Sequence, residues 1–561
     1  MARGSTGVAG FDATSERPEF TQAAAPLRIE QGLSRFAQRK WLVIVLAGAI
    51  SLGARALLLP VVPIPKPAIQ DEFSYLLASD TFASGRLTNP TPPCPEHFES
   101  PQVILHPTYA SKYPPFSAMV MALGQKLTGQ PWVGVWLAMG VFCATLCWAI
   151  QGWLPPMWAM FGTLIAILRI GVVSYWTESY WGGTCAAIGG ALLIGAVPRL
   201  IRRPRARVAV AFAIGLAIVA NTRPYEGVVM AAVCIGCIAV GLARTGRLAH
   251  AARAVIVPIA LVLIPLSAWM CYYNYRVTGS ALKLPYMAHE ELYVVWSPLL
   301  WETHPKPEPT YTSSTLRDFW LIADRGEKQF SRDHLLKAHG SDLLQLGRFL
   351  LGWPLILCAA GFARPLWRDR TARAALLLAG AFYAGAAFDA RLFPHYAAPA
   401  ATLAYIIAAS ALRAARNSWP GASVEQLYVT AGIFALFAVV TVLAWLSPQN
   451  RYLFADIDYH VRAKHATVAE QLAKVAGDHL VLVHYGPHHD LYEELVYNQA
   501  DIAHSRFIWA RSLGEARDQV LIRQYAGRKV WWLEEDGTSK LTAYADQYNS
   551  YYYQPLRWLL R

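Results

Sequence analysis

Two polar stretches of the sequence carry side chains suited to proton transfer and anion binding. Asp71 and Glu72 open a segment with a helical pattern that continues to Ser84, and Lys112 lies in the stretch SKYPPF, whose two prolines fix the chain at the start of another helix. A carboxylate at a helix start caps the helix or acts as a general base. A lysine beside a membrane binds phosphate or extends to lipid headgroups. The residues alone leave both interpretations open for each side chain.

The composition excludes a soluble enzyme and a disordered chain. Of 561 residues, 55% are hydrophobic and only 16% are charged, and the chain has 20 Trp and 27 Tyr. Soluble globular domains have about 25% charged residues. The net charge of +13 comes from basic residues in short runs between apolar stretches, which predicts membrane topology and no nucleic-acid partner. The sequence therefore predicts a polytopic α-helical membrane protein.

Eleven apolar runs are predicted to span the membrane. They cover residues 41–62, 131–152, 155–173, 184–198, 206–221, 225–243, 254–272, 346–363, 374–389, 396–413 and 427–446. A further apolar run, Pro114 to Leu127, is too short for a comfortable crossing, because a span needs about 20 residues. Placing this run at the interface puts the arginine-rich connections on one side, as the positive-inside rule expects.

This topology predicts three regions. Residues 1–40 form a cytoplasmic N-terminal segment, residues 41–446 form a transmembrane domain, and residues 447–561 form a soluble α/β domain on the opposite side. That opposite side also receives two outer loops, 63–113 and 273–345. The C-terminal domain is predicted to have a parallel sheet, because short apolar runs at 480–484, 507–510 and 530–533 alternate with helical patterns at 463–475, 491–499 and 513–525.

The first outer loop resembles that of a known superfamily. DEFSYLLASDTFASGRLTNP followed by SKYPPFSAMVMALGQKLTG is similar to the Asp-Glu, Tyr, Gly-x-Leu and Lys-x-Pro-Pro pattern of the GT-C superfamily of membrane glycosyltransferases. The bacterial relatives of protein O-mannosyltransferases and of the lipid A aminoarabinose transferase show this pattern. Here Tyr113 separates the lysine from the prolines, whereas the aminoarabinose transferases place the lysine directly before them. The protein mannosyltransferases commonly have a histidine at that place.

The resemblance implies a GT-C-like fold and an enzyme that moves a sugar from a polyprenyl-phosphate carrier to an acceptor hydroxyl, usually with inversion. Asp71 matches the proposed catalytic aspartate, and Lys112 matches the lysine that contacts the donor phosphate. Glu72 is expected to hydrogen-bond the acceptor or to position Asp71. The acceptor is a lipid, a glycan or a protein. The location implied is the bacterial inner membrane, with the C-terminal domain in the periplasm.

Further site residues are predicted at the outer ends of the spans. The phosphate-binding candidates are Arg223, Arg391 and His395, of which Arg391 is preferred over His395 because a guanidinium can hold phosphate by two hydrogen bonds. The substrate-binding candidates are Tyr75, Tyr113, Glu178, Trp181 and Tyr286. Ordinary alternatives are an interfacial aromatic belt for Trp181, an internal ion pair for Arg223 with Glu226, and headgroup anchoring for Arg391.

No cofactor is firmly predicted. A divalent metal at His289 and Glu290 is possible, although adjacent residues alone make a poor site. The competing classes are a transporter or flippase of a lipid-linked substrate and a noncatalytic scaffold. Transport predicts charged residues at mid-membrane in two related halves, but only Arg55 and Arg169 lie well inside or near the predicted spans and no inverted repeat is evident.

Overall fold

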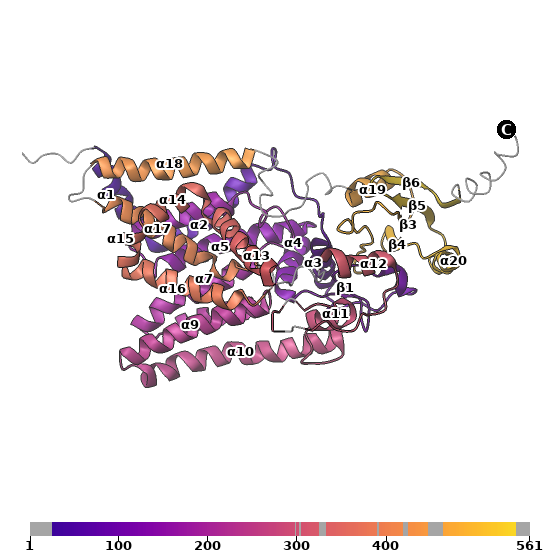
Figure 1. The fold of residues 1–561 in the computed structure, drawn as a ribbon, viewed down its shortest axis with the longest axis horizontal. Helices are drawn as coiled ribbons and strands as arrows, with labels where there is room; N and C mark the ends of the chain where they lie inside the picture. The colour runs from indigo at the N-terminus through magenta and orange to yellow at the C-terminus, as the bar shows by residue number, and fades with distance from the viewer. Residues whose placement is uncertain are drawn as a thin grey trace, which may run out of the picture.

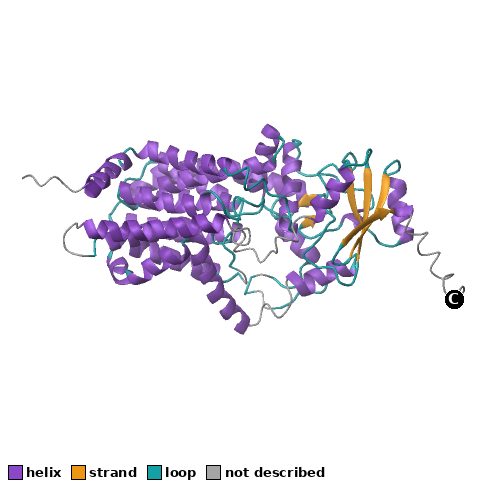
Figure 2. Ribbon diagram, turned by 90° about the horizontal axis from the view of Figure 1, so that it is seen from above, coloured by secondary structure: helices purple, strands orange, loops and turns teal. Residues whose placement is uncertain are grey.

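The protein is elongated, with a helical bundle at one end and a sheet-containing domain at the other (Figure 1). The computed structural model describes residues 25–297, 299–301, 304–324, 332–389, 392–418, 424–446 and 464–545. Short helices and strands of the two outer loops lie between the bundle and the sheet domain (Figures 1 and 2). The molecule is therefore divided along its length into apolar helices, outer loops and an α/β unit.

Seven of the described helices are long and apolar enough to cross a membrane. They lie in α2 (Lys40–Leu57), α5 (Pro131–Ile150), α7 (Thr184–Arg202), α9 (Pro224–Arg244), α10 (Leu248–Thr278), α17 (Ala401–Arg416) and α18 (Val424–Leu446). A bent pair, the end of α13 (Arg332–Leu350) with α14 (Gly352–Gly361), makes an eighth span if both parts cross together. The chain is thus a multi-pass membrane protein.

The remaining three predicted spans are also helical but shorter than a typical crossing. They correspond to α6 (Pro156–Ala166) with η2 (Ile167–Gly171), α8 (Ala206–Ala220) and α16 (Arg370–Ala386). Two further helices, α1 (Ala25–Ala37) and α15 (Ala363–Arg368), flank the bundle. Helix α4 (Pro115–Thr128) covers the run that was predicted to lie at the interface.

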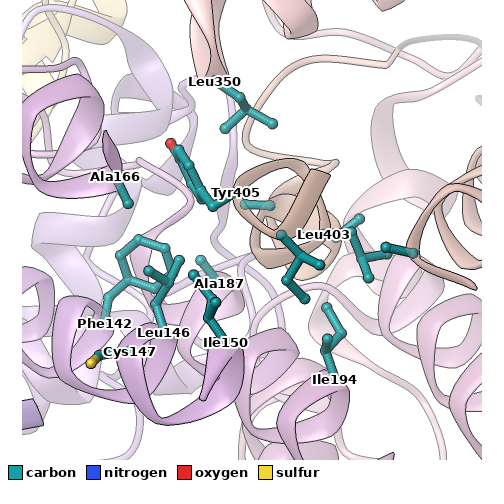
Figure 3. Packing of buried hydrophobic residues seen from close by; sticks show 14 of the residues in the cluster. Phe142, Leu146, Cys147, Ile150, Ala166, Ala187, Ile194, Leu350, Leu403 and Tyr405 are labelled. Atoms are coloured by element: carbon teal, nitrogen blue, oxygen red, sulfur yellow. The ribbon is translucent and has the colours of Figure 1, made fainter. Parts of the chain in front are cut away.

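The bundle is held together by close packing of apolar side chains. Figure 3 shows Phe142, Leu146 and Ile150 of α5 beside Ile194 of α7 and Leu403 of α17, all within one buried cluster. Small residues bring other helices still closer. A Cβ on Gly124 of α4 would lie 2.2 Å from the backbone nitrogen of Gly134 on α5, so only glycine permits this contact. The later part of α4 therefore packs directly against α5.

The two outer loops contain short helices and strands. The first contains α3 (Gln70–Ala83), η1 (Pro95–Phe98) and an antiparallel pair, β1 (Val103–Ile104) with β2 (Ala110–Ser111). The second contains α11 (Pro285–Tyr293), α12 (Ser314–Asp318) and η3 (Phe319–Asp324), and ends in α13.

The C-terminal domain has a four-stranded sheet in the order β4-β3-β5-β6. Strands β3 (His479–Tyr485), β4 (Phe507–Arg511) and β5 (Lys529–Glu535) are parallel, as the sequence predicts, and α19 (Lys464–Ala473) and α20 (Glu515–Gln524) accompany them. Strand β6 (Ser539–Ala543) pairs antiparallel with β5 and was not predicted. The sheet is therefore mixed.

The helix predicted at 491–499 is wrong. This segment is not helical. Its hydrogen bonds include those to a side chain of its own and to strand β4. Glu494 Oε1 accepts from the backbone nitrogens of Leu495 (3.0 Å) and Val496 (2.9 Å). The Asn498 amide donates to the Trp509 carbonyl (2.7 Å) and accepts from the Trp509 nitrogen (2.9 Å), which joins the segment to β4.

Candidate active site

Helix α3 carries Asp71 and Glu72 in its first turn, and Glu72 caps the helix. Glu72 Oε2 accepts from the backbone nitrogens of Ala68 (2.7 Å) and Ile69 (3.2 Å), while Oε1 accepts from the nitrogen of Tyr180 (3.1 Å). Both oxygens of this buried carboxylate are thus used for structure. Asp71, the second residue of α3, is half-buried.

Tyr113 connects Asp71 to the end of the first outer loop. Its hydroxyl donates a hydrogen bond to Asp71 Oδ1, and its ring stacks on that of Tyr75 with 4.3 Å between ring centres. Burial, reinforced by the negative charge of Asp71, raises the pKa of Tyr113 well above its usual value. The phenol therefore keeps its proton and remains a donor to the carboxylate.

Lys112 is surrounded by three aromatic rings, one of which is that of Tyr113. Its Nζ lies 5.3 Å from the ring centre of Tyr113, 4.9 Å from that of Tyr286 and 5.8 Å from that of Trp320. The side chain is only 3% exposed. Aromatic faces attract a cation without neutralising its charge. Asp71 and Lys112 both contact Tyr113, so the structure brings the predicted base and the predicted phosphate ligand together.

Arg223 and His395 lie near these residues. The Arg223 guanidinium lies 4.3 Å from the ring centre of Tyr396, and the His395 ring lies 4.4 Å from that of Trp181. His395 Nδ1 is 3.2 Å from the Tyr175 hydroxyl. Burial and the positive charge of Arg223 hold the pKa of His395 well below its usual value, so His395 is neutral.

The charge of Arg223 also reaches the Asp71 region. Burial raises the pKa of Tyr75, the Arg223 charge opposes that rise, and the Asp71 charge adds to it. Tyr75 therefore lies within electrostatic range of both the guanidinium and the carboxylate. The charges of Arg223 and Asp71 thus both act on the Tyr75 side chain.

A further predicted residue, Glu178, has an ion-pair partner. Glu178 pairs with Arg55 through two hydrogen bonds, from Nε at 2.7 Å and from Nη2 at 3.0 Å, and the two side chains are 2% and 0% exposed. Arg55 also donates to the Val62 carbonyl at 2.9 Å. Arg391 lies outside the described residues.

His289, which was first considered for a metal together with Glu290, has aromatic surroundings. His289 is buried, with its ring 5.0 Å from that of Tyr293 and 5.2 Å from that of Trp320. Among the described residues, no group of three or more His, Cys, Asp or Glu side chains is placed to hold a metal ion.

Three neighbours of the site were not predicted: Tyr175, Trp320 and Tyr396. Tyr396 follows His395 directly and Tyr175 precedes Trp181 in a segment rich in aromatics, so both had a sequence signal. Trp320 had no such signal in the sequence, because it lies in η3 of the second outer loop and meets Lys112 only in the folded protein.

An apolar cavity of about 360 Å³ lies elsewhere, between α1, α6, α17 and α18. Its two charged residues, Glu30 and Arg416, pair with each other at 3.0 Å. It contains none of the predicted site residues.

Comparison with known proteins identifies the fold. Neither the protein-family models nor the curated protein sequences gave a match. Among solved structures, ArnT from Cupriavidus metallidurans in the apo state aligns with a TM-score of 0.50 and 15% identity, over 89% of this chain and 93% of ArnT. The same protein bound to undecaprenyl phosphate gives 0.48 and 14% over 91% and 93%. The Archaeoglobus fulgidus oligosaccharyltransferase with a tethered acceptor peptide gives 0.44 and 12% over 88% and 68%. The chain therefore has the fold of ArnT, which confirms, at the level of the fold, the predicted resemblance to the GT-C membrane glycosyltransferases.

Proposed function

We propose that this protein is a glycosyltransferase that moves a sugar from a polyprenyl-phosphate carrier to an acceptor hydroxyl at the outer face of the membrane. The observation that carries the proposal is that Asp71 and Lys112 both contact Tyr113, Asp71 at its hydroxyl and Lys112 at its ring. A carboxylate and a buried cation at a membrane surface match the two needs of this reaction, a base and a ligand for the leaving phosphate.

The reaction breaks one bond and forms another at the anomeric carbon. The acceptor oxygen attacks this carbon while its proton passes to the Asp71 carboxylate, and the bond from the anomeric carbon to the phosphate oxygen breaks. The carrier leaves as a phosphate monoester whose extra negative charge is stabilised by Lys112. Attack opposite the leaving group inverts the configuration of the sugar.

The surrounding residues have supporting roles in this proposal. Tyr113 holds the Asp71 carboxylate by its hydroxyl, and Glu72 fixes the start of α3 and thereby positions Asp71. Arg223 adds positive charge near Tyr75, and Arg391 and His395 remain proposed phosphate ligands. Trp181 and Tyr286 offer ring faces to the sugar or carrier.

The fold likeness supports the same class of donor. ArnT, which shares this fold, has been solved with undecaprenyl phosphate bound. The proposal gives this chain a polyprenyl-phosphate sugar as donor and a lipid, glycan or protein hydroxyl as acceptor. The proposal places the protein in a bacterial inner membrane. Residues 1–40 are then in the cytoplasm, and the outer loops and residues 447–561 are in the periplasm.

The test is sugar transfer by the purified full-length protein in lipid nanodiscs. Radiolabelled polyprenyl-phosphate sugars are offered with a cell-envelope extract as acceptor, and the label is followed into a new glycan, lipid or protein band. Wild type and the control D501N, which changes a surface carboxylate of the C-terminal domain, are expected to transfer the label, and D71N is not. A flippase would move the donor across a vesicle membrane without forming a glycosidic bond, and that result would refute the proposal.

A further inference from the structure

The C-terminal domain and the first outer loop share one hydrophobic core. Phe73, Leu77 and Phe98 of the loop pack in the same buried cluster as Leu480, Tyr497 and other side chains of the sheet domain. A core that is shared in this way cannot be separated into two independent units, because each half leaves apolar surface exposed without the other. The sheet domain is therefore a structural partner of helix α3.

Helix α3 has two functional faces. Asp71 and Tyr75 are four residues apart and lie on the face toward Tyr113. Phe73, Leu77 and Asp80 follow at i, i+4 and i+7 and lie on another face, because successive residues turn by about 100° around a helix. This second face meets the C-terminal domain.

The segment 495–500 provides the contacts on that second face. The Tyr497 ring stacks on Phe73 with 4.4 Å between centres and an angle of 4° between the planes. Three residues further on, the Ala500 nitrogen donates to Asp80 Oδ2 at 2.8 Å. Between them, the Asn498 carbonyl accepts from the Tyr109 hydroxyl at 3.0 Å. The first and third turns of α3 are thus both tied to this segment.

The segment is itself fixed on the sheet. The Asn498 amide makes two hydrogen bonds to the Trp509 backbone, and Glu494, which holds the nitrogens of Leu495 and Val496, pairs with buried Arg511. The His465 ring lies 5.0 Å from that of Phe73 and 4.2 Å from that of Trp509, and burial lowers its pKa to about 4, so it packs as a neutral ring. Phe73 is therefore clamped by the C-terminal domain two residues from Asp71.

We propose that the segment 495–500 supports the transfer site from behind α3, with Tyr497 as the positioning residue that sets the rotation and the start of α3, and thereby the place of Asp71. This inference rests on the proposed function for its catalytic consequence. Tyr497 acts through its ring: its hydroxyl is buried and has no hydrogen-bond partner among the described residues. The C-terminal domain then contributes to turnover without contacting the substrate.

The chain offers a matched control in Tyr525. Tyr497 and Tyr525 lie in the same core, are 6% and 8% exposed, and both lack a hydroxyl partner in the described structure. The Tyr525 ring, however, meets that of Phe98 in η1, with 6.0 Å between ring centres, whereas the Tyr497 ring stacks on Phe73 of α3. Y525A therefore reproduces the loss of an aromatic ring from this core without releasing α3.

The first measurement is hydrogen–deuterium exchange of the full-length protein in nanodiscs, read on peptides that cover residues 70–83. Y497A is expected to accelerate exchange in α3, whereas Y497F and Y525A leave it close to wild type. Unchanged α3 exchange in Y497A, or equal acceleration in Y525A, would overturn the inference. If Y497A does not fold, Y497L replaces it, because leucine keeps apolar contact but cannot stack. This arm needs no substrate, so it decides the positioning role even if wild type transfers no sugar.

The second measurement separates turnover from binding. Y497A is expected to lower kcat by about 10- to 100-fold, the loss typical of a misplaced catalytic group, while KM for the donor stays close to wild type. Y497F should restore kcat. A kcat loss in Y525A equal to that in Y497A, after correction for folded protein, would show that the core acts only through general stability. Failure of wild type itself to transfer sugar would count against the proposed function and not against the exchange result.

Discussion

Asp71 and Glu178 are both acidic residues predicted for the site, yet their surroundings differ completely. Glu178 is almost fully buried and its charge is matched by two hydrogen bonds from Arg55. Asp71 is half-buried and receives a hydrogen bond from the neutral phenol of Tyr113. The buried ion pair ties the segment that contains Glu178 to helix α2, whereas the hydrogen bond from Tyr113 holds the carboxylate that we propose as the base. The residue that pairs with an acidic side chain is thus a better guide to the role of that side chain than the position of the side chain in the sequence.

The largest effect is expected from D71N. The amide keeps the size of the side chain but cannot accept a proton, so kcat should fall by about 10²- to 10⁴-fold. The measurement is single-turnover sugar transfer, with thermal unfolding as the check on folding. An active, folded D71N would remove Asp71 from the role of base.

E178A should affect stability rather than chemistry. Removing one member of a buried ion pair leaves the other charge uncompensated, which costs about 3–5 kcal/mol. The thermal midpoint of the protein in detergent should fall, and the double variant R55M/E178M should recover much of the loss. Should E178A remain as stable as wild type but lose turnover, Glu178 would belong with Asp71 in the chemistry.

K112M should weaken donor binding. A hydrogen bond between an ammonium and a phosphate contributes about 1.5–3 kcal/mol, so we expect the Kd for polyprenyl phosphate to rise by about 10- to 150-fold. Lys126 at the exposed end of α4 gives the matched control K126M, which should bind normally. Equal binding by both variants would place the phosphate elsewhere.

The smallest effect concerns His395 and pH. Its folded pKa lies well below the ordinary value of about 6.5 because of burial and Arg223. Below pH 6.5 the unfolded chain therefore binds a proton that the folded protein excludes, so stability falls as pH decreases through this range, by up to about 1.4 kcal/mol per pH unit. Comparing thermal midpoints at pH 7.5 and 5.5, H395F should show a smaller drop than wild type. Identical drops would contradict a buried neutral histidine.

The membrane helices were predictable because hydropathy is a local property. Each of the eleven apolar runs lies on a helix, and the run after Lys112 forms α4 as expected. The structure matches seven or eight of these runs to helices of spanning length, and whether the shorter ones cross depends on packing that the sequence does not display.

The errors arose where distant residues decide the outcome. The pattern at 491–499 favoured a helix, but Asn498 bonds to Trp509 and Tyr497 stacks on Phe73, more than 400 residues away. The Arg55 partner of Glu178 lies on α2, 123 residues away, and was likewise not predicted. Strand β6 carries few apolar residues, and its strand structure comes from antiparallel pairing with the edge of β5. The motif around Asp71 was visible in sequence, whereas the aromatic enclosure of Lys112 by Tyr286 and Trp320 required the fold.

A structure of the full-length protein in nanodiscs with polyprenyl phosphate bound would decide whether Asp71 and Lys112 serve one ligand. We expect the phosphate within hydrogen-bonding distance of Lys112 Nζ, with the Asp71 carboxylate facing the position that the anomeric carbon of the sugar would occupy. A phosphate bound away from Lys112, with Asp71 turned toward no part of the ligand, would contradict the proposed transferase site.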